Sequence, residues 1–219
     1  MAGVSSAHDP PGLGEHEQRP DRLIALSDGI FAIAMTLLVL DVSVPDGLDH
    51  AGFARALHQA WPHLGTYALS FALIGAVWRD HRRIFHLVRR ADGRVSRLNL
   101  TLLGFSALLP FPTALLADYG GTEPLAVTLY AAIVAIINLL LLALFLTVRR
   151  DEGLRTRPVE GRAAQGTIAD FAGTVLIAAA SVVVAFTVSA DAGLLTWLAA
   201  LPAGLAARLW QRSSGRDRT

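Results

Sequence analysis

The sequence contains no cysteine and no lysine, and both absences narrow the functions that it can have. Without thiols there can be no disulfide, no zinc–thiolate site and no cysteine nucleophile in this chain. Every basic side chain is an arginine, and the formal net charge is only +1. A nucleic-acid partner would need a strongly basic face, so we expect none.

Catalytic and metal-binding patterns are missing as well. His81 and His86 are five residues apart, which does not place them on one helical face, and no His-Glu-x-x-His pattern occurs. Ser27 stands in Leu-Ser-Asp-Gly rather than in the Gly-x-Ser-x-Gly turn of hydrolases. The residues therefore predict no enzyme, no metal site and no cofactor.

The chain has long hydrophobic runs instead. Hydrophobic residues make up 53% of it and charged residues only 17%, below the roughly 25% that is usual in soluble domains. A bilayer core of about 30 Å needs roughly 20 apolar residues per helix. Six stretches qualify, which predicts an all-α membrane protein with six transmembrane helices at residues 23–44, 64–85, 98–117, 125–148, 168–188 and 194–210. Pro110 and Pro112 predict a bend or an end in the third of these.

The arginines alternate between the loops and so predict an orientation. They gather before the first span, in the second and fourth loops and in the C-terminal tail, whereas the other loops contain only Arg55. Because basic residues of short loops stay on the cytoplasmic side, both termini are expected in the cytoplasm of a cell-membrane protein. The expected domains are a disordered tail (1–21), a membrane domain (22–210) and a basic tail (211–219), with anionic lipids contacting the arginine clusters.

The loop at residues 45–62 allows two interpretations. Phe53, Leu57 and Trp61 have helical spacing, which would suit a short helix at the membrane surface. An ordinary connector is the alternative.

Polar residues interrupt the first span near its start. Ser27 and Asp28 should seek partners on other helices, because ionisable groups are costly inside a membrane. Arg22 is six residues from Asp28 and so lies on a different helical face. The candidate partners are Asp80, His81 and Asn99. Such a network could serve function or only fix helix packing.

An apolar stripe follows in the same span. Its members Ile33, Leu37, Leu40 and Val44 recur at helical spacing. The stripe could face lipid or a neighbouring helix, or it could form a constriction that closes a pore by dewetting. Thr36 lies beside it, and its hydroxyl is expected to bond to the carbonyl four residues earlier.

These residues together resemble the first-helix signature of the TMEM175 potassium channels. The matching run is Arg22-x-x-x-Leu26-Ser27-Asp28-Gly29, continued by Ala32-Ile33-Ala34-x-Thr36-Leu37-Leu38. Leu26 stands where that family usually has phenylalanine, which keeps an apolar residue at the position. Further similarity lies in Trp78-x-x-His81-x-x-x-Phe85 and in Asn99 with Leu108-Leu109-Pro110-Phe111-Pro112-Thr113.

The resemblance implies a homotetramer of six-helix subunits whose first helices line a pore. It implies a bottleneck at Ile33, Leu37 and Leu40 and a role for Thr36 in potassium preference. It also implies a polar network formed by residues of the first three helices, namely Arg22, Ser27, Asp28, His81 and Asn99. The Thr-Val-Gly-Tyr-Gly filter of other potassium channels is absent from the sequence, as the resemblance implies.

The expected function is therefore a potassium-permeable cation channel gated by a hydrophobic constriction on the first helix. Potassium is the permeant ion, and the partners are other copies of the chain and membrane lipids. A vestibule would be polarised by Asp28 or by the acidic residues Asp41, Asp46 and Asp49. The alternative is a proton channel or a proton-coupled secondary transporter that uses Asp28 and His81.

Overall fold

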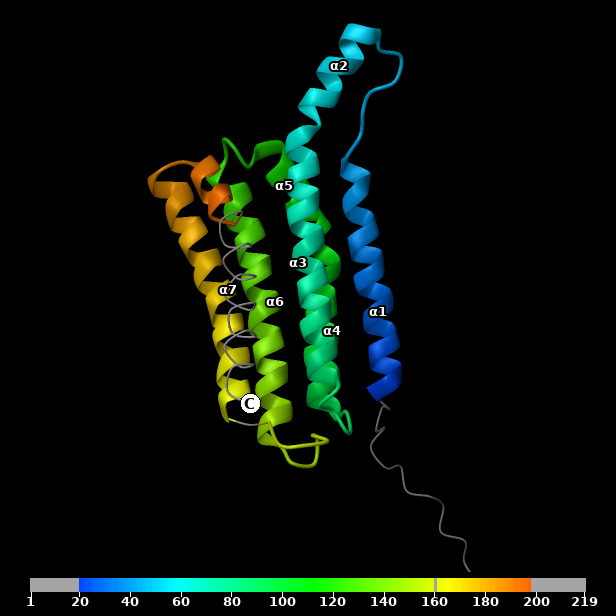
Figure 1. The fold of residues 1–219 in the computed structure, drawn as a ribbon, viewed down its shortest axis with the longest axis vertical. Helices are drawn as coiled ribbons and strands as arrows, with labels where there is room; N and C mark the ends of the chain where they lie inside the picture. The colour runs from blue at the N-terminus through cyan, green and yellow to red at the C-terminus, as the bar shows by residue number, and fades with distance from the viewer. Residues whose placement is uncertain (1–19, 160, 198–219) are drawn as a thin grey trace, which may run out of the picture.

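The computed structural model describes residues 20–159 and 161–197, and within these ranges the regular elements are helices (Figure 1). In chain order they are α1 (Pro20–Leu37), the 3-10 turn η1 (Leu38–Asp41), α2 (His50–Gln59), α3 (Trp61–Phe85), α4 (Gly93–Leu108), α5 (Pro110–Tyr119), α6 (Pro124–Arg150) and α7 (Gly161–Thr187). The chain then re-enters a helix at Ala190, described as far as Trp197. No strand forms in the described ranges, which confirms the predicted all-α class.

Four helical segments are long and apolar enough to cross a membrane. They are Pro20–Leu40, Gly93–Tyr119, Pro124–Arg150 and Gly161–Thr187. They correspond to the first, third, fourth and fifth predicted spans. The second predicted span is α3, whose 25 residues suffice in length, although its last turns contain several charged side chains. The sixth, at residues 194–210, lies outside the described residues except for its first four positions.

The third predicted span is broken where the prolines stand. α4 ends at Leu108, and α5 begins at Pro110 after the single intervening residue Leu109. Proline has no amide hydrogen to donate, and its ring clashes with the carbonyl four residues earlier, so the helix cannot continue straight. The predicted interruption of the helix at these prolines is confirmed.

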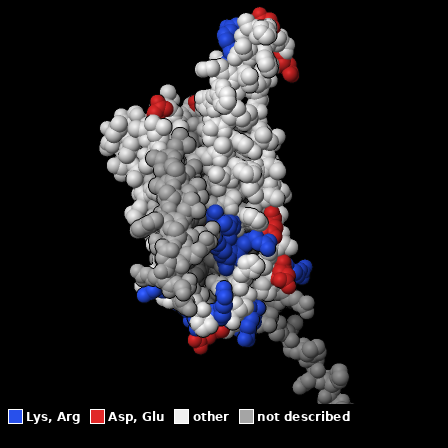
Figure 2. All heavy atoms as spheres, in the orientation of Figure 1, with Lys and Arg blue, Asp and Glu red and all other residues white. Residues whose placement is uncertain are grey.

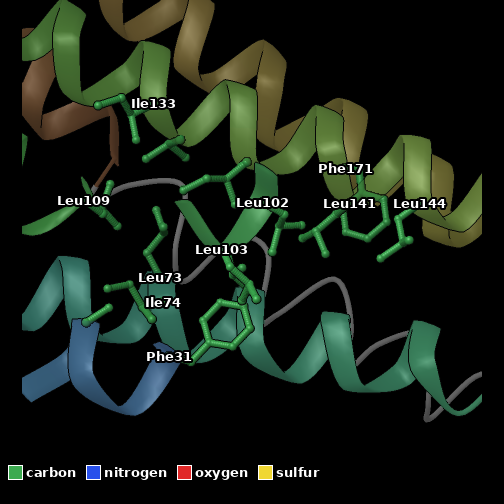
Figure 3. Close-up of a cluster of buried hydrophobic side chains, with 14 of the residues drawn as sticks. Phe31, Leu73, Ile74, Leu102, Leu103, Leu109, Ile133, Leu141, Leu144 and Phe171 are labelled. Carbon is green, nitrogen blue, oxygen red and sulfur yellow. The ribbon is translucent and has the colours of Figure 1, made fainter. Parts of the chain in front are cut away.

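The hydrophobic core is built around α4 and α6. Figure 3 shows Leu102 and Leu103 of α4 with Phe31 of α1 on one side and Leu141 of α6 on the other. Each of these four side chains is at most 1% exposed. Phe171 brings α7 into the same cluster through α6. The core therefore joins α1 to α4 and α4 to α6, while α3 packs directly on α1 and α6, and α7 packs on α6.

The arginines gather at one end of the bundle, which we call the arginine end (Figure 2). It contains the α3–α4 loop, the α6–α7 loop and the start of α1 (Figure 1). The two loops are joined, because the Arg89 amide donates to the Leu154 carbonyl at 2.7 Å and the Thr156 amide donates to the Leu87 carbonyl at 2.8 Å. The opposite end carries α2, which projects beyond the bundle as a continuation of α3 (Figure 1).

The segment before α3 contains a short helix, as the first of the two interpretations of residues 45–62 predicted. α2 begins at His50 because Asp49 caps it, accepting a hydrogen bond from the Gly52 amide at 2.7 Å. None of its side chains is buried. Whether it lies at a membrane surface stays a prediction.

The predicted tails fall almost wholly outside the described residues. The N-terminal tail was expected to reach residue 21, but α1 already begins at Pro20. Proline favours the first position of a helix, since its fixed φ suits the helix and its missing amide hydrogen would have no partner there. The C-terminal tail, residues 211–219, lies outside the described part of the chain.

Candidate functional site

α1 has two different faces. Five side chains at spacings of three and four residues turn inward and are at most 3% exposed, namely Leu23, Ser27, Phe31, Ala34 and Leu38. This face packs against α3 and α4. The spacing is that of a single helical stripe, so one side of α1 is fully used in packing against the rest of the bundle.

The other face of α1 carries the predicted stripe and is exposed. Ile33 is 59% exposed, Leu37 is 40% exposed and Leu40 is 70% exposed. Although Leu40 lies in η1, positions three apart align in a 3-10 turn, so it remains in line with Leu37. The three side chains predicted for the bottleneck therefore form one open apolar strip.

Val44, predicted as the fourth member of the stripe, does not belong to it. The helix ends at Asp41, and Val42 is already extended. Val44 precedes Pro45, whose ring disfavours helical backbone at the residue before it. The helical spacing was therefore extended one turn too far.

Thr36 lies on the exposed side of α1, next to this strip. Its hydroxyl donates to the Ile33 carbonyl at 2.9 Å, three residues back rather than the four expected. A helical threonine can reach either carbonyl, and here the bond lies just before the helix tightens into η1. Because its hydrogen is used, the oxygen can offer only lone pairs to the outside.

Ser27, Asn99 and His81 form a buried hydrogen-bonded chain across α1, α4 and α3. The His81 Nε2 lies 2.8 Å from Asn99 Oδ1, and Asn99 Nδ2 donates to Ser27 Oγ at 3.2 Å. Ser27 Oγ in turn donates to the Leu23 carbonyl at 2.7 Å. Since an amide oxygen only accepts, Nε2 carries the hydrogen in this arrangement. Two of the three predicted partners, His81 and Asn99, are thus joined to Ser27.

His81 is held between aromatic rings. It stacks on Phe85 with ring centroids 4.4 Å apart and meets the ring of Phe31 edge-on at 5.4 Å. Its Nδ1 is buried without a hydrogen-bond partner. This position suits the neutral imidazole, because an unpaired buried charge would be costly.

Asp28 has a separate set of partners on α3. Its Oδ2 accepts from Arg82 at 2.7 Å, and its Oδ1 accepts from the Trp78 indole at 2.8 Å. The Arg82 guanidinium also lies 5.8 Å from the centroid of the Trp78 ring. A carboxylate, a guanidinium and an indole thus join α1 to α3 at the arginine end.

Two sequence predictions for this network differ from the geometry. Arg22 is exposed and makes no hydrogen bond or ion pair within the described residues. Asp80, a candidate partner, instead contacts its helix neighbours Arg79 and Arg83. Sequence reasoning missed Arg82, although its position four residues after Trp78 places both on one face of α3.

A second buried polar cluster lies beyond the predicted site. Ser70 of α3 is 2.9 Å from the Thr113 hydroxyl of α5 and 3.2 Å from the Tyr130 hydroxyl of α6. No spacing pattern links these three residues, so only the folded arrangement reveals them.

Of the outer acidic residues proposed for a vestibule, the structure describes the side chains of Asp46 and Asp49. Asp46 and Asp49 are exposed in the segment before α2, and Asp49 serves as the cap of that helix. The side chain of Asp41 lies outside the described part of the structure.

Comparison with known proteins identifies relatives of the segment that carries this site. The model of a family described as the endosomal/lysosomal potassium channel TMEM175 matches residues 22–110. A potassium channel of Streptomyces collinus is 37% identical over 154 residues, which cover 69% of this chain and 75% of that protein. The bovine endosomal/lysosomal proton channel TMEM175 is 32% identical over 149 residues, covering 63% of this chain and 31% of the relative.

A solved structure has a similar fold. It is the crystal structure of a lysosomal potassium-selective channel TMEM175 homolog from Chamaesiphon minutus. The two match with a TM-score of 0.72 and 28% sequence identity, over 85% of this chain and 96% of the other. The likeness therefore extends beyond the first helices to nearly the whole bundle.

Proposed function

The chain belongs to the TMEM175 family of ion channels, and from this premise we propose that it forms a potassium-permeable pore without a Thr-Val-Gly-Tyr-Gly filter. The observation that carries the proposal is the exposed apolar strip of α1, formed by Ile33, Leu37 and Leu40. In a homotetramer the strips of four copies face one axis and form a hydrophobic constriction. Such a constriction closes by dewetting and conducts when it widens or hydrates.

The two faces of α1 support this assignment. The inward face is anchored by the chain from Ser27 to His81 and by the ion pair of Asp28 with Arg82. These contacts fix the rotation of α1 about its own axis, and so they fix the direction in which the strip points. A pore helix needs a fixed rotation, because turning α1 by the angle between two successive residues would bring a different side chain to the pore axis in place of Ile33.

Thr36 supports a cation preference beside the constriction. Its hydroxyl hydrogen is bonded to the Ile33 carbonyl, so its oxygen presents lone pairs and no donor. A dehydrating cation can use such an oxygen as a ligand, whereas an anion cannot. We assign Thr36 to potassium preference on this ground.

The topology that we propose has six spans per subunit and both termini in the cytoplasm of a cell-membrane protein. It rests on the arginine end, where the α3–α4 and α6–α7 loops are joined and α1 begins. The basic side of a membrane protein faces the cytoplasm. The contacts of Asp28 and the buried chain that contains His81 then both lie near the cytoplasmic mouth. Residues 22–210 form the channel domain, between tails at 1–21 and 211–219.

Potassium flux into liposomes tests the pore assignment. Replacing Leu37 or Ile33 with asparagine should raise resting flux, because a polar side chain keeps water in the constriction. Leu176→Asn is the matched control, since Leu176 is 69% exposed but lies on α7. Unchanged flux in both α1 variants, or an equal rise in the α7 control, would show that this strip does not form the constriction.

Proton conduction is the second candidate function, and the name of the bovine relative favours it. Asp28 and His81 are the ionisable groups that this function would use near the proposed mouth. Among the hydrogen bonds of the described residues, however, none joins them directly, so a relay would need water between them. Reversal potentials under opposed potassium and proton gradients separate the two ions. Uptake that saturates and requires a pH gradient would instead indicate a coupled transporter.

A further inference from the structure

A cavity of about 600 Å³ opens between α4 and α6 at the arginine end. Its wall on α6 is formed by Ala143, Leu146, Thr147 and Arg150, which recur at three and four residues and so share one face. Arg94, in the first turn of α4, lies across from them. The volume is that of small-molecule sites, roughly 300–1,000 Å³. No residue of α1 or of its network lines this cavity.

The lining changes from apolar to charged along the axis of α6. Ala143 and Leu146 lie toward the middle of the bundle, and Arg150 is the last residue of the helix. Leu139, one turn beyond Ala143 on the same face, is 50% exposed. An apolar wall that ends in arginines at the membrane boundary matches the two parts of a phospholipid, an acyl chain and a phosphate.

The acidic residues at the mouth are engaged by arginines other than Arg150. Asp151 Oδ1 accepts from the Gly153 amide at 2.9 Å, and Glu152 accepts from Arg155 at 2.6 Å. Glu152 is thus paired with Arg155, and the other oxygen of Asp151 contacts Arg94 of α4. Each carboxylate therefore has an arginine partner other than Arg150.

The two arginines of the cavity differ in the number of ion pairs that they make. Arg94 is shared between Asp92 at 3.2 Å and Asp151 at 3.5 Å, and the second contact is long. Its side chain is still 63% exposed. The Arg150 side chain is exposed and makes no ion pair or hydrogen bond within the described residues. Arg150 thus supplies a cation for which the described part of the subunit provides no counter-charge.

We propose that this cavity binds the phosphate group of an anionic phospholipid. Arg150 and Arg94 contact the phosphate, and one acyl chain lies along Leu146 and Ala143. The Thr147 hydroxyl donates to the Ala143 carbonyl at 2.8 Å, so its free lone pair can accept from a headgroup hydroxyl. A glycerol headgroup has that donor. Free phosphate would share the arginine contacts but would leave the apolar wall empty.

Native mass spectrometry of the purified full chain with dioleoylphosphatidylglycerol tests the site. Arg150→Gln or Arg94→Gln should each reduce retained lipid by about fivefold, as expected for one arginine–phosphate contact. Arg157→Gln is the matched control, because Arg157 is exposed in the α6–α7 loop but does not line the cavity. An equal loss in Arg157→Gln would show diffuse attraction to the basic surface and overturn the site.

Two further measurements complete the test. The first asks whether the apolar wall contributes to binding, and the second asks whether the ligand is a lipid or a free anion. Leu146→Trp fills the apolar wall while keeping both arginines, and it should also reduce lipid retention. Excess inorganic phosphate should fail to displace the lipid, and dioleoylphosphatidylcholine should be retained less than the glycerol lipid. Full retention in Leu146→Trp, or displacement by phosphate, would contradict the assignment to a lipid. Thermal melting confirms that each variant is folded.

Discussion

At the residue scale, Asn99 occupies the middle of a buried chain that joins three helices. Its Oδ1 serves His81 and its Nδ2 serves Ser27, so one side chain satisfies groups on α3 and α1. Ser27 has a second bond, to the Leu23 carbonyl of its own helix, whereas His81 Nε2 has only Asn99. Loss of Asn99 should therefore destabilise the buried chain more than loss of Ser27.

Asn99→Ala should lower the free energy of unfolding by about 2 kcal/mol, because it leaves the buried His81 donor without an acceptor. Ser27→Ala should cost about 1 kcal/mol, because it leaves the Asn99 Nδ2 group without its partner but removes a smaller side chain, and the Leu23 carbonyl stays within the helical backbone of α1. Melting temperatures in detergent give the order, with wild type highest and Asn99→Ala lowest.

Ser106→Ala is the control for this series. Ser106 is also a buried serine of a helix, and its hydroxyl bonds the Leu102 carbonyl of its own helix at 2.8 Å. Any excess loss in Ser27→Ala over Ser106→Ala measures the bond to Asn99. Equal melting of Asn99→Ala and Ser106→Ala would show that the chain between helices adds nothing to stability.

At the element scale, α4 depends on the carboxylate that starts it. Asp92 caps the helix by accepting from the Val95 amide at 2.8 Å, and Arg94 lies 3.2 Å from its other oxygen. Burial raises the pKa of Asp92, but the Val95 amide and the Arg94 guanidinium outweigh burial and hold the pKa below its usual range. The ionised cap is the form that stabilises the folded state.

This stabilisation should be present above the ordinary aspartate pKa of about 4 and should fade as the pH falls through the lower folded pKa. Asp92→Ala should cost about 1 kcal/mol at neutral pH. Asp92→Asn should retain most of the cap, because an amide oxygen also accepts, and it should lose the acid-dependent part. Melting temperatures from neutral to acid pH check this. A wild-type protein and an Asp92→Asn variant with parallel pH profiles would contradict it.

The elements were largely predictable because their signals are local. The apolar runs placed α6 and α7, and Pro110 placed the break between α4 and α5. The polar start of α1 pointed correctly to His81 and Asn99, because buried polar groups need partners. The actual partner of Asp28 was not predictable, since many arginines share that end of the chain. The cluster of Ser70, Thr113 and Tyr130 could not be predicted either. Its bonds join residues that are 43 and 60 positions apart in the sequence and follow no common period.

At the scale of the whole molecule, the absence of cysteine makes every introduced thiol unique. Arg55→Cys places a thiol on α2, and Arg157→Cys places one in the α6–α7 loop at the arginine end. If the arginine end is cytoplasmic, an impermeant maleimide should label Arg55→Cys in intact bacterial cells. It should label Arg157→Cys only after the membrane is opened. The reverse pattern would invert the proposed topology, and labelling of both from outside would show that the bundle does not cross the membrane.

The same thiol strategy tests whether α1 meets other copies of itself. In a homotetramer with α1 at the axis, Ile33→Cys should form disulfide-linked dimers on oxidation, because neighbouring strips then lie within bonding reach. One thiol per subunit cannot link more than two chains, so the complete assembly must be weighed by native mass spectrometry, where four times 23.3 kDa is expected. Leu176→Cys on the exposed face of α7 is the control and should stay monomeric. If both variants cross-link equally, the contacts are random collisions in the membrane. If only the α7 variant does, the strip on α1 faces lipid and the pore must lie elsewhere.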